Sequence, residues 1–226
     1  MGIKERQERD REAVRRSILD AARDLFVTEG FQNVSIRKIA ERIEYSPAAI
    51  YGYFPSKDDI FFALAEEGFR LLYGDRASYT ALEHLAPLER IRAIFWRLYE
   101  FSRDQPQYFA LMFVERSVPR ISREHERFAF AREMKQHIVG VLQACIDAGE
   151  LPPTLNPTVA MRALTVGVLG VAVMRLAERL APEENADLLA ADVLNVTLAG
   201  LRSGVTLQSP GFECPLHAPV ADAQAS

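Results

Sequence analysis

The sequence predicts an all-α protein of about nine helices. Apolar residues recur at three- and four-residue spacing along most of the chain, which places one apolar stripe on each helix. No stretch alternates apolar and polar residues for long enough to form a strand. Helix start signals are frequent. In Ser46-Pro47 and Asn156-Pro157, for example, an N-cap residue is followed by a proline, whose backbone lacks the N–H that would have no partner at the first helical position. With 226 residues, 49% of them hydrophobic, the chain can bury one core or two small ones.

The first predicted helix ends at Gly30, which is typical of a helix C-cap. Its apolar stripe consists of Val14, Ile18, Ala21, Ala22, Leu25 and Phe26. Residues 1–11 alternate in charge and are expected to extend this helix into solvent. Such an arm could add contacts to phosphates, but a solvated helix start is the favoured interpretation.

Two short amphipathic helices with a tight break between them are predicted within residues 35–57. The first has an apolar stripe formed by Ile36, Ile39, Ala40 and Ile43. The second opens at Ser46-Pro47 and ends near Tyr53, because the residue before Pro55 is pushed out of helical geometry. Two such helices, the second with small residues at its tip, can enter the major groove of DNA, although an ordinary helical hairpin has the same spacing.

Residues 15–64 resemble the N-terminal domain of the tetracycline-repressor (TetR) family of bacterial transcription regulators. The resemblance covers about a fifth of the chain and preserves many positions in order. The matching positions are Ile18, Leu19, Ala21, Ala22, Leu25, Phe26, Gly30, Phe31, Val34, Ser35, Ile36, Ile39, Ala40, Ser46, Pro47, Ala48, Ala49, Ile50, Tyr51, Tyr53, Phe54, Ser56 and Lys57. The family implies a homodimer with an N-terminal three-helix helix-turn-helix domain and a C-terminal helical bundle that binds a ligand.

By position, the resemblance implies a set of DNA contacts in and around the helix-turn-helix. The expected contacts are Ser35, Arg37, Ser46, Pro47, Ala48, Tyr51, Tyr53 and Lys57. Tyrosine hydroxyls and Lys57 can donate to phosphates, and Arg37 could reach a base edge. Two departures from the family pattern stand out. Glu44-Tyr45 replaces a turn that usually contains Gly, and Gly52 replaces an aromatic residue found in some members.

The remaining chain reads as a succession of helices, which places a DNA-binding domain at 1–56 and a ligand-binding and dimerisation domain at 57–204. Expected helix starts are Ser56, Pro87, Pro106, Ser122, Pro157 and Pro182. Residues 205–226 hold Pro, Gly, Ala and Ser without a period, so we expect a mostly disordered tail.

The helix from 158 to 180 is apolar nearly all round, and the helix that follows is strongly apolar as well. A chain of this size has little interior to cover both, so we expect one face to meet a second subunit; a central helix buried in a monomer is the alternative. The expected interface residues are Leu164, Val168, Val171, Leu189, Val193 and Val196.

Aromatic residues are dense between positions 95 and 130. Small-ligand pockets are mostly apolar with a few polar groups, and this mixture could line one. A plain core explains most of these residues too, and for any single one of them it is the favoured interpretation. The expected lining of a pocket for a small hydrophobic or aromatic effector is Trp96, Tyr99, Phe113, Met134, His137 and Met161.

Charge and cysteine content exclude some classes of function. The net charge of −4 argues against a globally basic nucleic-acid coat protein, yet residues 1–57 hold 11 Lys and Arg against 9 Asp and Glu. Cys145 and Cys214 match no metal or redox spacing, so neither a metal nor a cofactor is expected. The charged N-terminus lacks a signal-peptide pattern, and Arg162 interrupts the most apolar stretch, so we expect a cytoplasmic protein without a membrane span.

These observations predict a ligand-responsive regulator, most often a repressor in the family, that binds a palindromic double-stranded operator as a homodimer. An all-helical enzyme is disfavoured because the four histidines are scattered and no nucleophile or phosphate-loop motif is present. A helical adaptor that never contacts DNA would not need two tyrosines and a lysine after a capped short helix.

Overall fold

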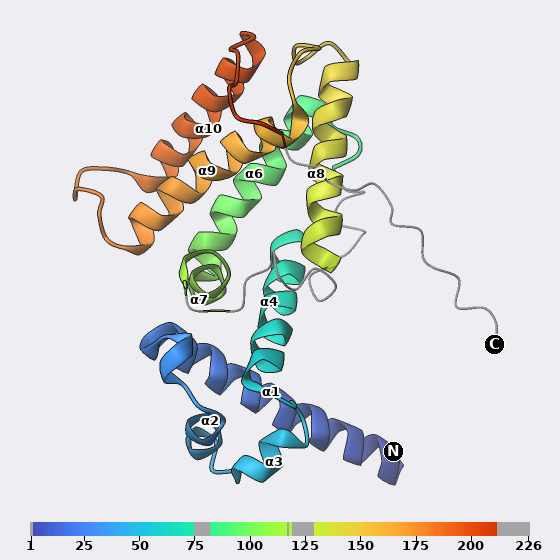
Figure 1. The fold of residues 1–226 in the computed structure, drawn as a ribbon, viewed down its shortest axis with the longest axis vertical. Coiled ribbons are helices and arrows are strands. Elements are labelled where there is room, and N and C mark those ends of the chain that lie inside the picture. The colour runs from blue at the N-terminus through green and yellow to red at the C-terminus, as the bar shows by residue number, and fades with distance from the viewer. Residues whose placement is uncertain (1, 75–81, 117, 119–128, 212–226) are drawn as a thin grey trace, which may run out of the picture. The chain divides into compact units, whose positions relative to one another are not determined.

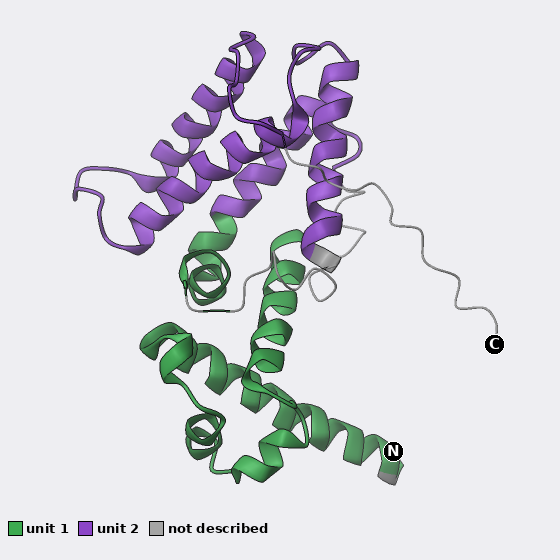
Figure 2. Cartoon of the chain, in the orientation of Figure 1, with its two compact units in different colours: residues 1–76, 100–129 green, residues 77–99, 130–226 purple. Residues whose placement is uncertain are grey.

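The computed structural model describes residues 2–74, 82–116, 118 and 129–211. Nine α-helices and no strand occur within these residues, as the sequence predicts (Figure 1). The chain divides into two compact units, residues 1–76 with 100–129, and residues 77–99 with 130–226 (Figure 2). This compact division differs from the predicted functional division at residue 56, which stays a prediction.

Unit 1 contains the N-terminal helices and a later segment of the chain. Its elements are α1 (Ile3–Glu29), η1 (Phe31–Asn33), α2 (Ile36–Arg42), α3 (Pro47–Tyr51), α4 (Lys57–Tyr73), the last residues of α6 (Pro87–Asp104), α7 (Pro106–Phe109) and the π-helical turn η2 (Ala110–Val114). Gly30 ends α1 at a positive φ of 82°, which confirms the predicted C-cap.

An aromatic cluster forms the centre of unit 1. The ring of Phe31 lies 5.0 Å from that of Phe26 on α1 and 5.7 Å from that of Phe61 on α4. Gly68 on α4 provides a close approach, because a Cβ there would lie 2.3 Å from the Met112 sulfur of η2. These contacts join α4 both to α1 and to the α7–η2 segment, so the helices around the helix-turn-helix share one core.

Unit 2 contains most of α6, α8 (Ala129–Asp147), α9 (Pro157–Leu176) and α10 (Ala186–Arg202). Gly167 allows α9 and α10 to pack closely, since a Cβ there would lie 3.0 Å from the Val193 side chain. Among the described residues, α9 alone is long and apolar enough to cross a membrane by length and composition. Eight of its residues are buried within unit 2, a property that it shares with core helices.

Most predicted helix starts are confirmed, and one is wrong. The side chain of Asn156 caps α9, and Ser56 caps α4 by accepting from the Asp59 N–H at 3.1 Å. The last helix does not open at Pro182; it begins at Ala186, because Asn185 caps it by accepting from two backbone N–H groups. The predicted start at Ser122 and most of the predicted tail lie outside the described residues.

Candidate functional site

The turn between α2 and α3 is a complete Schellman motif. The Tyr45 N–H donates to the Ala40 carbonyl at 2.9 Å, and the Glu44 N–H donates to the Glu41 carbonyl at 3.3 Å. Glu44 sits at the position that requires a left-handed backbone, with φ of 59°. Glycine is usual there, so the turn forms in spite of its unusual residue, at some conformational cost.

The exposed tip of α3 consists of small residues. Ser46 caps the helix by accepting from the Ala49 N–H at 3.2 Å, and Pro47 supplies the first helical residue. Pro47 and Ala48 are exposed, whereas Ile50 is fully buried and anchors the helix. The tip can therefore approach another surface closely without disturbing the core.

Three predicted phosphate-contacting residues differ in how the structure holds them. Tyr51 is 55% exposed, and Tyr53 is half-buried. The Lys57 ammonium donates to the Phe31 carbonyl at 2.7 Å and lies 4.2 Å from the centre of the Phe31 ring. Burial lowers the pKa of Lys57, and Asp58 opposes that shift. An ammonium has three donors, so Lys57 can hold η1 in place and still reach a phosphate.

The two predicted contacts on α2 lie at its start. Ser35 caps α2 by accepting from the Lys38 N–H at 3.2 Å, which leaves its hydroxyl proton as a donor. Arg37 is 80% exposed and donates to Glu41 at 2.9 Å along the same helix. This exposed pair contributes little to stability, so Arg37 can exchange Glu41 for another acceptor.

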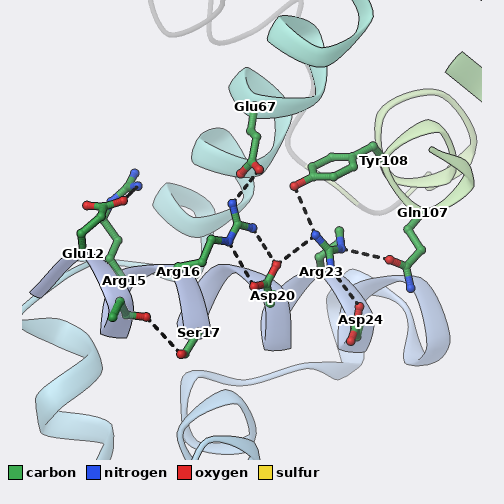
Figure 3. A network of polar contacts seen from close by, with 11 residues as sticks. Glu12, Arg15, Arg16, Ser17, Asp20, Arg23, Asp24, Glu67, Gln107 and Tyr108 are labelled. Atoms are coloured by element: carbon green, nitrogen blue, oxygen red, sulfur yellow. Dashed lines mark hydrogen bonds and ion pairs between the residues drawn. The ribbon is translucent and has the colours of Figure 1, made fainter. Parts of the chain in front are cut away.

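A polar network, which sequence reasoning missed, fixes α1 against α4 and α7 (Figure 3). Arg16 donates to Asp20 at 2.8 Å and to Glu67 of α4 at 2.6 Å. Arg23 donates to the carboxamide oxygen of Gln107 at 3.0 Å and to the Tyr108 hydroxyl at 3.3 Å. The sequence signal for this network is the seven-residue spacing of Arg16 and Arg23, which places both on one face of α1.

The six predicted ligand-binding residues are divided between the units. Phe113 belongs to unit 1 and packs 5.3 Å from the Phe109 ring, whereas the other five belong to unit 2. Trp96 lies 5.4 Å from Tyr99, and the buried Tyr99 hydroxyl donates to Asp187 at 2.7 Å. Met161 is also buried, while Met134 and His137 are half-buried.

A cavity of about 260 Å³ lies elsewhere in unit 2, away from the predicted lining. It opens between the start of α9, the end of α10 and the extended segment that follows α10. Its lining residues are Pro152, Thr154, Leu155, Asn156, Val159, Leu201, Gly204, Val205, Thr206, Leu207 and Ser209. No motif in the sequence pointed to this cavity.

The structure places the predicted interface residues on different sides of α9 and α10. Leu164, Val168 and Val171 are buried within unit 2, and Leu189 and Val193 are half-buried. Of the predicted six, Val196 is the one that is well exposed, at 71%. The outer apolar residues are Val166, Val173 and Met174 on α9 with Leu188 and Val196 on α10. Because α9 is apolar on nearly every side, its sequence could not distinguish the outer face from the inner one.

Comparison with known proteins agrees with this architecture. Residues 18–64 match the family model described as bacterial regulatory proteins, tetR family. Residues 91–197 match a second model, the C-terminal domain of tetracyclin-repressor-like proteins. Together the two matches cover the helix-turn-helix and most of the helices that follow it.

Curated relatives align over part of their length. The HTH-type transcriptional repressor Rv1474c of Mycobacterium tuberculosis is 44% identical over 55 residues, which are 24% of this chain and 29% of that protein. The HTH-type transcriptional regulator RutR of Escherichia coli is 29% identical over 135 residues, which are 60% of this chain and 58% of RutR. The chain thus aligns with less than two thirds of either relative.

Solved structures share the fold over a longer range. The TetR family transcriptional regulator PfmR from Thermus thermophilus superposes with a TM-score of 0.64 at 22% identity, covering 81% of this chain and 98% of PfmR. At this identity the likeness concerns the fold alone. Taken with the two family models and the capped helix-turn-helix, it shows that the chain belongs to the TetR family of bacterial transcription regulators.

Proposed function

We propose that the protein is a ligand-responsive transcriptional repressor that binds a palindromic operator as a homodimer. The observation that carries the proposal is the exposed, small-residue tip of α3, which the Schellman turn and the Ser46 cap hold in position. A tip of this kind can enter the major groove, because backbone and bases must come close. The names of the mycobacterial repressor and of RutR support a role in transcription.

Phosphate contacts would supply most of the affinity, and base contacts the sequence preference. Ser46, Tyr51, Tyr53 and Lys57 surround α3 and are the proposed positioning contacts. Arg37 is the proposed base-reading residue, because its exposed guanidinium can bind a guanine through two hydrogen bonds. Affinity should therefore fall steeply with salt for every sequence, while preference among sequences should depend on Arg37.

Dimerisation would pair the outer faces of α9 and α10. Val166, Gly170, Val173 and Met174 recur at four- and three-residue spacing, and a Cβ on Gly170 would meet nothing within 4 Å. Such a face is costly to leave in water, and a two-fold dimer would cover it in both chains at once. Two recognition helices could then read half-sites about 34–36 Å apart.

The effector is proposed to be a small hydrophobic or aromatic molecule bound near Trp96 and Tyr99. It would release the operator by binding better to a dimer whose recognition helices are wrongly spaced. A coupling of about 1–3 kcal/mol would change operator affinity roughly 5- to 150-fold. Titration of candidate ligands against Trp96 fluorescence tests the location, and a ligand that releases DNA without changing that fluorescence would contradict it.

A gel-shift assay with the DNA upstream of the protein's own gene tests DNA binding. We expect a retarded complex that Tyr51→Ala weakens for specific and random duplexes alike, because a phosphate contact carries no sequence information. Arg37→Ala should instead reduce the preference for the operator over random DNA. Failure of the wild-type chain to bind any duplex at low salt would refute the proposal and favour the helical adaptor.

We infer from this role, and from the family, that the protein acts in the cytoplasm and is not an enzyme.

A further inference from the structure

Helix α1 extends well beyond the core that it covers. Residues 4–13 are exposed, and from residue 4 onward the first buried residue is Ile18. In Figure 1 the N-terminal part of α1 runs on past α3. An exposed helical extension of this length adds little to the stability of unit 1, because tertiary packing supplies most helix stability.

Residues seven positions apart lie on the same face of α1, because seven residues make about two helical turns. By this spacing, the basic residues of α1 fall on two faces. Ile18 and Leu25 lie on the buried face of α1, and the exposed Lys4 and Arg11 lie on the outward continuation of the same face. Arg9, Arg16 and Arg23 share another face, on which Arg16 and Arg23 meet α4 and α7. The face that packs on the helix-turn-helix therefore continues outward as a cationic edge.

Arg11 on this edge, and Arg15 one helical turn further along the same face, lie over the segment that follows α3. The Arg11 guanidinium is 5.8 Å from the centre of the Tyr53 ring, and that of Arg15 is 5.3 Å from the centre of the Phe54 ring. Cation–π contacts of this length orient a guanidinium without consuming its hydrogen-bond donors. Arg11 is thus held against a predicted phosphate contact, Tyr53, and Arg15 against the residue that follows it.

The arginines of α1 differ in whether a carboxylate neutralises their charge. Arg16 and Arg23 are neutralised by Asp20, and Arg16 also by Glu67. Arg15 has an exposed partner, Glu12, at 3.5 Å. Within the part of the chain that the structure describes, neither Arg11 nor Arg9 has a carboxylate at ion-pair distance. Residues 4–12 hold as many acids as bases, so placement rather than net charge distinguishes Arg11.

We propose that Arg11 is a further DNA contact, which binds the phosphate backbone beside the recognition helix. The inference rests on the proposed DNA-binding function. The Arg11 guanidinium can donate two parallel hydrogen bonds to one phosphate, while the Tyr53 ring fixes the position of the guanidinium. The N-terminal arm of α1 is accordingly part of the DNA-binding surface.

The test compares three variants of the full chain on a duplex of random sequence, with affinity measured by fluorescence anisotropy between 50 and 200 mM NaCl. Arg11→Gln should weaken binding and make the slope of log K against log salt shallower by about one for each bound chain. Arg9→Gln removes the same charge from the other face and should bind like the wild type. Arg11→Lys keeps the charge but loses the two parallel hydrogen bonds, so it should retain the salt slope and lose part of the affinity.

Three results would overturn the inference: an Arg11→Gln slope equal to that of the wild type, an equal loss in Arg9→Gln, or an Arg11→Lys slope as shallow as that of Arg11→Gln. Arg11 is exposed, so the thermal unfolding midpoint should not change and serves as the check on folding. A wild-type chain that fails to bind DNA at 50 mM NaCl would instead refute the proposed function. The two failures are therefore distinguishable.

Discussion

The guanidinium of Arg16 on α1 donates a 2.6 Å hydrogen bond to the carboxylate of Glu67 on α4. Both side chains are about one-third exposed, at 38% and 31%, so solvent screens part of their attraction. We expect Glu67→Gln to lower the free energy of unfolding by about 1 kcal/mol, measured by urea denaturation. Glu66→Gln is the matched control, because among the described residues Glu66 pairs with the exposed Arg70 of the same helix. Equal losses in the two variants would contradict a specific role for the α1–α4 pair.

Replacing Glu44 with glycine should stabilise the protein. Glu44 adopts φ of 59° at the αL position of the turn, where a Cβ is unfavourable. Relief of this strain, less the extra entropy of glycine in the unfolded chain, should raise the free energy of unfolding by about 0.5–1 kcal/mol. Glu41→Gly, inside α2, should instead destabilise by about 1 kcal/mol. A loss of stability in Glu44→Gly would show that the Glu44 side chain makes a compensating contact.

A charge on the outer face of α10 should separate the proposed dimer. Val196 is 71% exposed and lies on that face, so Val196→Glu would bury a carboxylate between the subunits. Sedimentation velocity should show a dimer for the wild type and a shift toward monomer for the variant. Val205→Glu changes another exposed valine that lies beyond the end of α10, and it should leave the dimer intact. An undiminished dimer in Val196→Glu would place the interface elsewhere.

Acid should destabilise the protein partly through His137. Burial lowers the pKa of His137, and the Arg90 guanidinium lowers it further, whereas Glu83 acts in the opposite direction. The unfolded state therefore binds a proton near pH 6.5 while the folded state still resists it, so the free energy of unfolding falls as pH decreases below about 6.5. His137→Gln should reduce this fall in urea titrations between pH 7.5 and 5.5. His84→Gln, at an exposed position, should follow the wild type, and identical pH dependence in all three proteins would contradict the assignment.

The sequence determined the helices and their order, because the signals for them are local. Ser46 and Asn156 mark helix starts by their cap chemistry, and Gly30 marks an end by its freedom at positive φ. The stripe of Ile36, Ile39 and Ala40 identified the buried face of α2, since one apolar side faces a polar one. The start of α10 differs from the predicted one at Pro182, because two start signals compete there and only the capping geometry of Asn185 decides between them.

Only the tertiary structure decided what depends on contacts between distant residues. Arg16 and Glu67 are separated by 51 positions, and no local rule pairs them. The packing of Gly167 on α10 and the open space at Gly170 define the outer face of α9, because a helix that is apolar all round has no directional pattern of its own. Local propensity thus fixes the elements and the chemistry of their ends, whereas the packing of one element on another fixes which side chains remain available for a partner.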